Sequence, residues 1–187
     1  MPGSLTSIGA YAFANCTNLA TIVIPDGLSN IGYGAFRGCA SLARLTFPAN
    51  LTNIEDYAFF GCTNLSGVYC SGSAPSFQPI SFYLNRKAKF YYLPGTTGWG
   101  TTFAGLPSAL WKPAVSAGDP TFGVRSNQFG FTINWASDKS IIVETANNLL
   151  NPEWTPLSTN ILTSGSSYFS DPKWTNAPTR LYRLRAP

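Results

Sequence analysis

The sequence predicts an α/β solenoid of 23-residue repeats, followed by a small all-β antiparallel sandwich. Three observations predict this fold: apolar columns that recur in one register, a strand and a helix pattern within each repeat, and alternating apolar residues near the C-terminus. We therefore expect two domains, over residues 1–112 and 113–187. The chain has 187 residues, of which 44% are hydrophobic, so each domain can bury a core.

The first third of the chain repeats itself every 23 residues. Five columns hold the same kind of apolar residue in three successive repeats. They are Ile8/Ile31/Ile54, Phe13/Phe36/Phe59, Cys16/Cys39/Cys62, Leu19/Leu42/Leu65 and Ile22/Leu45/Val68. Self-similarity at such a period is typical of repeat architectures. Because one repeat cannot enclose its own apolar face, we expect the repeats to stack about 4.8 Å apart.

Each repeat is expected to contain one short parallel strand. Leu45 and Phe47 alternate with polar residues, which indicates a strand with one buried face. Pro48 follows directly and cannot donate a hydrogen bond to a ladder, so the strand should end there. Stacked repeats then place these strands side by side on one face of the solenoid.

The other half of each repeat has the apolar spacing of a short helix. Ala35, Phe36 and Cys39 fit one helix face. The residue before each cysteine belongs to a type that tolerates the left-handed conformation, in which helices commonly end. These residues are Asn15, Gly38 and Gly61. We therefore expect short helices opposite the strands.

The pattern Ile31-Gly32-x-x-Ala35-Phe36-x-Gly38-Cys39-x-x-Leu42-x-x-Leu45-x-Phe47-Pro48 resembles the BspA-type leucine-rich repeat of bacterial surface proteins. The resemblance covers about residues 2–75. It implies an α/β-type leucine-rich repeat solenoid and a noncatalytic recognition or adhesion protein, secreted or at the cell surface. The fourth unit has Ser71 in place of the proline and Ala74 in a leucine column, so the array should end near there. One last irregular strand at residues 90–92 and a closing segment to Trp111 are expected to cap it.

Residues 111–120 are rich in Pro, Gly and Ser and lie outside the 23-residue register, which indicates a domain boundary. Beyond it, residues 129–135 and 181–185 alternate, and residues 141–143 are β-branched. Short strands separated by turn residues favour a small antiparallel sandwich. Residues 120–187 also resemble a β module found at the C-terminal ends of large exported proteins of environmental bacteria.

Composition argues against several function classes. The absence of histidine excludes Ser-His-Asp and Cys-His nucleophiles and histidine-ligated zinc. Among the 8 acidic residues, only Glu55 and Asp56 are adjacent, and they are expected to precede a repeat helix, where acids favour the dipole. Basic residues are scattered singly, which argues against nucleic acid as a partner. The sequence contains no run of about 20 apolar residues, the length needed to span a bilayer, so membrane insertion is not expected. We expect no catalytic residues, metal or cofactor.

The four cysteines are expected to be reduced core residues. Three share one repeat column, where neighbouring rungs could come within disulfide distance. A column of three leaves one unpaired, however, and Cys70 occupies a strand position that Phe47 holds in the preceding repeat. Buried thiols also pack well as small hydrophobic groups.

The best candidate binding surface is the strand face of the solenoid, and a protein is its expected ligand. Residues between the buried columns should project outward on this face. The candidates are Thr21, Val23, Arg44, Thr46 and Tyr69. Arg44 and Tyr69 are the only large ones, and both types are enriched at binding hot spots. A merely solvated face is the alternative reading of the same pattern.

Two further functions remain open at this point. Trp154 and Trp174 lie beside prolines in expected loops and could bind carbohydrate, or the chain could be a structural spacer. Pro2 aligns with Pro25 and Pro48, so the first repeat is expected to lack a covering rung. We therefore expect either a fragment of a longer repeat protein or edge-to-edge association through that first repeat.

Overall fold

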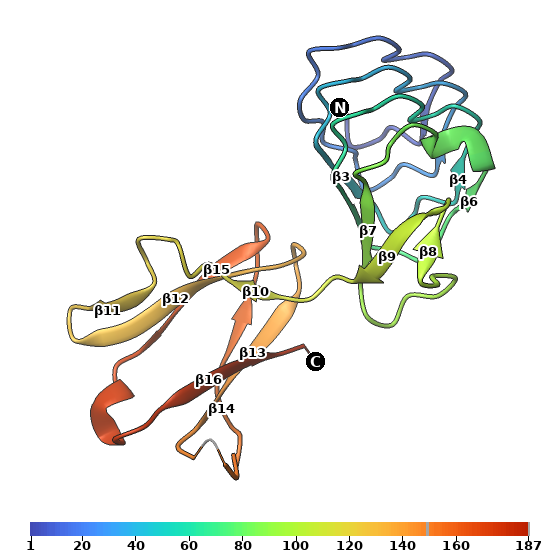
Figure 1. Ribbon diagram of the computed structural model, residues 1–187. Coiled ribbons are helices and arrows are strands. Elements are labelled where there is room, and N and C mark those ends of the chain that lie inside the picture. The colour runs from blue at the N-terminus through green and yellow to red at the C-terminus, as the bar shows by residue number, and fades with distance from the viewer. Residues whose placement is uncertain (149, 187) are drawn as a thin grey trace. The chain divides into compact units, whose positions relative to one another are not determined.

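A computed structural model describes residues 1–148 and 150–186 (Figure 1). The chain divides into two compact units, Met1–Trp111 and Lys112–Pro187. Unit 1 contains the repeats and unit 2 contains the C-terminal strands, and each unit is described by itself.

Unit 1 is a solenoid with parallel strands, as the repeats predict, but it has a second sheet of parallel strands that the sequence did not predict (Figure 1). The longer strands are β3 (Arg44–Phe47), β5 (Gly67–Cys70), β7 (Lys89–Tyr92) and β9 (Leu106–Leu110), with β8 (Thr102–Phe103) antiparallel to β9. The second sheet consists of β1 (Ser7–Ile8), β2 (Asn30–Ile31), β4 (Asn53–Ile54) and β6 (Ser76–Phe77). The register pairs Ile8 with Ile31 and Ile31 with Ile54. The 23-residue period is therefore the length of one turn of the coil.

The apolar columns stack along the solenoid as expected. The rings of Phe13, Phe36, Phe59 and Phe82 lie nearly parallel, with successive centroids 5.2, 5.2 and 5.0 Å apart. Phe36 and Phe59 are fully buried. Each ring gains apolar burial and an offset contact with the next rung, so the column stabilises stacking rather than any single repeat.

The prediction of short helices in the repeats is wrong. The structure describes turns there, because each rung has two residues in the left-handed region, four positions apart. These residues are Tyr11 and Asn15, Gly34 and Gly38, and Tyr57 and Gly61, with φ between 57° and 73°. Backbone N–H groups therefore donate to the next rung, as Phe13 does to Ala35 O (2.8 Å), rather than within a helix. In the described residues, the only helical segments are two 3₁₀ turns, η1 (Pro79–Phe82) and η2 (Trp174–Asn176).

The two ends of the solenoid also differ from the predicted pattern. Residues 20–25 are not described as a strand, and one backbone bond, from Ala43 N to Ala20 O (3.3 Å), joins them to the next rung. At the other end, β7 is not the last strand, because β9 pairs with it in parallel and β8 turns back on β9. Residues 102–110 thus supply an antiparallel hairpin that covers part of the stack.

A polar ladder runs beside the second sheet. Asn53 Nδ2 donates to Asn30 Oδ1 (2.7 Å), and Ser76 Oγ donates to Asn53 Oδ1 (2.9 Å). Glu55 accepts from Asn30 Nδ2 (3.2 Å) and from the Tyr33 N–H (2.9 Å). With no helix to precede, Glu55 instead satisfies polar groups of the previous rung.

Unit 2 contains two antiparallel sheets, which agrees in part with the predicted sandwich. In one sheet, β12 (Gln128–Asn134) pairs with β10 (Ala114–Val115), β11 (Gly123–Arg125) and β15 (Ser166–Asp171). In the other, β13 (Ser140–Ala146) lies between β14 (Thr155–Ile161) and β16 (Leu181–Arg185). The alternation of apolar and polar residues predicted β12 and β16 closely. β14 and β15 contain too few apolar residues to show such a pattern.

Apolar residues of both sheets form the core of unit 2. Phe131 and Ile133 are buried on β12, and Ile141 and Val143 are buried on β13. The ring of Tyr182 on β16 contacts aromatic rings of the other sheet, with centroids 5.1–6.0 Å away. The two sheets therefore share one apolar interior.

Candidate functional site

Three of the predicted binding residues lie together on the strand face of unit 1. Arg44 and Thr46 project from β3 and are exposed, while Leu45 and Phe47 between them are buried. Register places Thr46 beside Tyr69 of β5, and Tyr69 beside Tyr91 of β7. The outward positions thus form rows across neighbouring rungs.

An aromatic and cationic patch forms at the C-terminal end of this face. We define the strand-face patch as Tyr69, Lys89, Tyr91 and Trp111. The Tyr69 ring stacks on Tyr91 (centroids 5.1 Å apart) and contacts Trp111 (4.9 Å). Lys89 Nζ lies 5.4 Å from the Tyr91 centroid, a cation–π distance. All four side chains are half-buried, so the patch is held by mutual contact and still open to solvent.

Gly67 makes room for this patch. It lies opposite Arg44 and Lys89 in the register. A Cβ at Gly67 would lie 3.1 Å from Tyr69 Cε2 and 3.3 Å from its hydroxyl oxygen. The absent side chain therefore lets the Tyr69 ring fold back over the strand.

The other two predicted residues lie on the first rung, outside the sheet. Thr21 and Val23 are exposed, and Val23 retains 81% of its accessible surface. Both belong to residues 20–25, which no strand includes. They are exposed as predicted but are not ordered by strand pairing.

Sequence analysis missed three patch residues, and a register shift explains why. Tyr91 follows Tyr69 by 22 residues, and Trp111 follows Tyr91 by 20, so neither falls in the 23-residue column. The aromatic run at residues 90–92 was the available signal. Because the last rungs are shorter than 23 residues, strand pairing and not the period brings these residues together.

A second aromatic row follows the turn side of unit 1. The Tyr11 and Tyr33 centroids lie 5.3 Å apart, and those of Tyr33 and Tyr57 lie 5.5 Å apart. The Arg37 guanidinium lies over Tyr57 and Phe60, 5.8 and 5.4 Å from their centroids. A side-chain hydrogen bond with Tyr11 raises the pKa of Tyr33. These ring contacts join successive turns, although Tyr11 remains 51% exposed.

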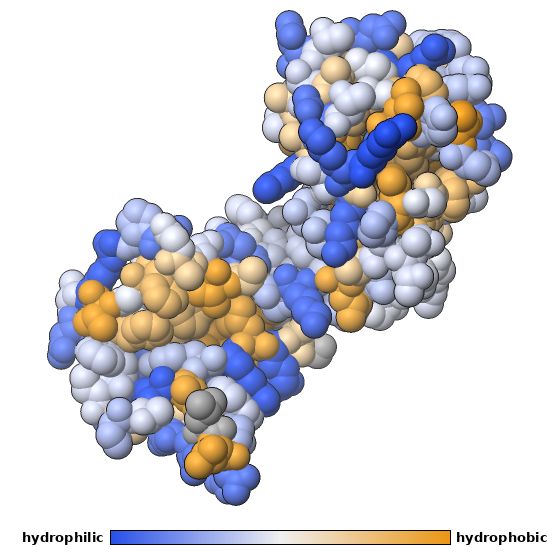
Figure 2. All heavy atoms as spheres, viewed as in Figure 1, coloured by the Kyte–Doolittle hydropathy of each residue, from blue (hydrophilic) through white to orange (hydrophobic). Residues whose placement is uncertain are grey.

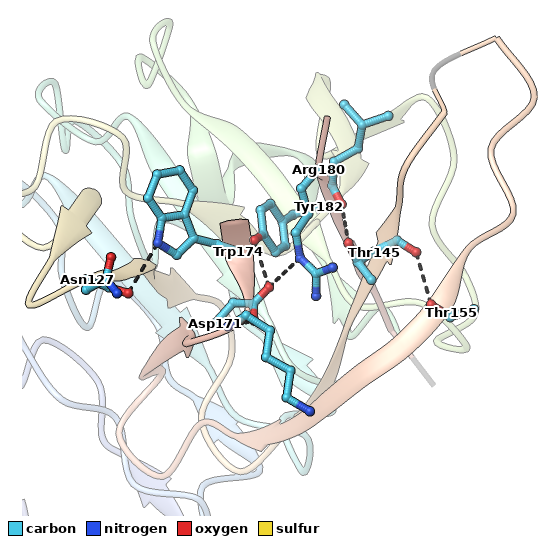
Figure 3. A network of polar contacts seen from close by, with 9 residues as sticks. Asn127, Thr145, Thr155, Asp171, Trp174, Arg180 and Tyr182 are labelled. Carbon is cyan, nitrogen blue, oxygen red and sulfur yellow. Dashed lines mark hydrogen bonds and ion pairs between the residues drawn. The ribbon is translucent and has the colours of Figure 1, made fainter. Parts of the chain in front are cut away.

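The two tryptophans proposed for carbohydrate are half-buried in unit 2. The Arg183 guanidinium lies 4.5 Å from the Trp154 centroid and covers one face of that ring. Trp174 Nε1 donates to Asn127 O (3.2 Å), which ties η2 to the turn before β12 (Figure 3). Both rings therefore have contacts within unit 2 that explain their presence.

The cysteines are free, and three of the four are buried. Burial raises the pKa of the Cys62 thiol to about 12 and also raises the pKa of Cys39, so both stay protonated at neutral pH. Both thiols donate to carbonyls of the preceding rung, Cys39 Sγ to Phe13 O (3.0 Å) and Cys62 Sγ to Phe36 O (3.1 Å). Cys16 is exposed, contrary to the expected core position.

The two buried carboxylates of unit 2, Asp171 and Glu144, are engaged in structural contacts, and Figure 3 shows those of Asp171. Asp171 accepts from Arg180 Nε (2.6 Å), Tyr182 Oη (2.9 Å) and the Lys173 N–H (2.8 Å). Burial opposes ionisation of Asp171, but these donors outweigh it and lower its pKa. Hydrogen bonds from Arg185 and Arg183 likewise lower the pKa of Glu144. Within residues 1–148 and 150–186, no three Cys, Asp or Glu side chains form a metal-binding group, and no helix could span a membrane.

Stacked turns, two parallel sheets and an exposed strand face define a solenoid of stacked repeats. Residues 1–100 match the BspA type leucine rich repeat region in six copies, so the chain belongs to the BspA-type leucine-rich repeat family. Among solved structures, a leucine-rich repeat protein of T. pallidum is similar, with 22% identity and a TM-score of 0.39. That match covers 46% of this chain and 52% of the other, about half its length. The comparison with curated proteins gave no match.

Proposed function

We propose that this chain is a noncatalytic recognition module of a bacterial surface or secreted protein, and that unit 1 binds a protein partner through its strand face. Membership of the repeat family supports protein interaction in general. The observation that carries the proposal is the strand-face patch, where two tyrosines, a tryptophan and a lysine are held in one cluster.

The chemistry of the patch suits a protein partner. Aromatic rings already ordered by contact lose little conformational entropy on binding, and they supply large apolar area with polar edges. Lys89 and Arg44 add positive charge beside them, which favours a partner with acidic groups near an apolar anchor. Thr46 and the small residues of neighbouring rungs give a surface that a partner can approach closely.

The test is affinity capture from the secreted and envelope fractions of the producing organism, followed by titration of the purified partner. Tyr91→Ala should weaken binding by about tenfold or more, as expected at a hot spot. Tyr83→Ala is the matched control, because Tyr83 is 56% exposed on the turn side of the same unit. Equal affinity of the two variants would refute the proposed surface.

The rival functions predict other results. If unit 2 binds carbohydrate, Trp154→Ala and Trp174→Ala should abolish signals on a glycan array that Tyr91→Ala leaves intact. If the chain is only a spacer, neither assay should detect a specific ligand. Association through the first rung would appear as concentration-dependent mass in light scattering, and it should disappear when Phe13 is replaced by a charged residue.

A further inference from the structure

Unit 2 has an open apolar groove that the proposed function of unit 1 does not use. Its volume is about 570 Å³. Figure 2 shows hydrophobic surface gathered on unit 2 between β12 and β16. Phe122 and Val115 line this groove and remain 43% and 36% exposed. Apolar surface of this kind usually marks an interaction site.

The two walls of the groove are built differently. On one side, the lining residues alternate along the chain: Pro113, Val115 and Ala117 in one segment, and Phe129 and Phe131 in another. Alternate residues share one face of a strand, so this wall is the inner face of the β10–β12 sheet. On the other side, five consecutive residues line it, residues 180–184. Because side chains alternate between faces, a run of consecutive residues means that the groove borders the backbone edge of β16.

That backbone edge is free among the described strands. β13 pairs with both β14 and β16, whereas β16 pairs with β13 alone. On the unpaired side of an edge strand, every second residue directs its N–H and C=O outward. The groove thus combines a row of backbone donors and acceptors with an apolar floor, which is the surface that one more strand would cover.

Charge beside the edge specifies the partner further. Arg183 and Arg185 both bond to Glu144, with Nε–O distances of 2.6 and 2.7 Å. Two cations share one carboxylate, so one positive charge is uncompensated within this cluster. Both arginine side chains are 45% exposed. Arg180, in contrast, is neutralised by Asp171.

We propose that the groove binds an extended peptide strand of another protein, which pairs with β16 and buries apolar side chains at alternate positions against Phe122 and Phe129. Its outward-facing positions carry acidic residues that meet Arg183. Five residues of β16 allow a paired length of about 17 Å. Backbone pairing supplies affinity and the alternate pockets supply specificity, as in other strand-addition complexes.

The experiment uses the whole chain and a capped peptide of about seven residues, in which valine alternates with aspartate or threonine. The control peptide has the same sequence with N-methyl groups on alternate backbone nitrogens, which block pairing but keep the side chains. Calorimetric titration should give binding of the first peptide and a loss of about tenfold or more with the second. Replacing the aspartates by lysine should also weaken binding.

Two variants locate the site. Phe122→Ala should weaken binding of the acidic peptide by about fivefold or more. Ile161→Ala is the control, because Ile161 is 64% exposed at the end of β14 and does not line the groove. Circular dichroism on both variants establishes that unit 2 remains folded. The proposal is overturned if the plain peptide does not bind, if N-methylation has no effect, or if the free chain self-associates through β16 at micromolar concentration.

Discussion

The two units of this chain are stabilised in different ways. In unit 1, the same contacts recur in every rung. Equivalent apolar side chains of successive rungs stack on one another, and backbone N–H groups donate to carbonyls of the next rung. In unit 2, single charged groups join segments that no repeat relates, as Asp171 does with Arg180 and Tyr182. Periodic contacts spread stability along the chain of unit 1, whereas unit 2 combines an apolar core with a few polar junctions between segments.

The phenylalanine column of unit 1 gives the strongest test of this difference between the two units. Phe59→Ala should lower the free energy of unfolding of unit 1 by about 3–5 kcal/mol, because a fully buried ring between two stacked neighbours is removed. Hydrogen exchange with mass spectrometry measures the loss in each unit separately. Phe13→Ala should have a smaller effect, since Phe13 is half-buried on the first rung. Equal losses would mean that stacking does not carry the stability.

The polar junction of unit 2 is the next point to test. Asp171→Asn should destabilise unit 2 by roughly 2 kcal/mol, because it leaves the largely buried Arg180 guanidinium without its counter-charge. Unit 1 should keep its exchange protection. Asp138→Asn, at an exposed turn, is the control and should change little. A loss of protection in unit 1 would contradict the separation of the two mechanisms.

Acid should destabilise unit 2 through its two buried carboxylates, which gives a test that needs no mutation. The pKa of Asp171 is lowered from its ordinary value of 3.8, and that of Glu144 from 4.5. Both carboxylates thus stabilise unit 2 fully above those ordinary values and lose that contribution as the pH falls through the lowered pKa. Thermal unfolding followed between pH 6 and 2 should show unit 2 losing stability progressively below about pH 4. The dependence should be weaker in Asp171→Asn.

The smallest expected effect has the opposite sign. Asn85 follows Cys16, Cys39 and Cys62 in the repeat column, and its Nδ2 donates to Phe59 O (2.9 Å) as the thiols do one rung earlier. Its Oδ1 is buried without a hydrogen-bond partner. Asn85→Cys should therefore stabilise unit 1 by about 1 kcal/mol, which denaturant unfolding can measure. Asn85→Ala removes both groups, and a stabilisation there as large as with cysteine would show that the donated bond contributes nothing.

The sequence predicted the solenoid well because its information is periodic. Ile31 and Ile54 pair one rung apart, and Gly38 and Gly61 have the positive φ that their type allows. The helix prediction failed because Ala35, Phe36 and Cys39 suit a helix and a compact turn equally. The turn forms with Tyr11 and Tyr57 at positive φ, which a helix does not allow. A tyrosine in a sequence does not indicate a positive φ, so the turn could not be predicted from it.

The candidate site was predicted only where it obeys the period. Arg44, Thr46 and Tyr69 fall on the strand face, whereas Tyr91 and Trp111 join it through a shorter last rung that only strand pairing reveals. In unit 2, the side-chain partners of Asp171 are 9 and 11 residues away and have no fixed spacing.

The sequence by itself determined the length of one coil, the residues that face its interior and the family to which the chain belongs, because identical side chains must meet their equivalents when repeats stack. Tertiary structure alone decided where the turns reverse, how the strand-face patch closes around Tyr69 and which edge of unit 2 is left open. Those features depend on contacts between segments of unrelated sequence, and such contacts leave no periodic trace along the chain.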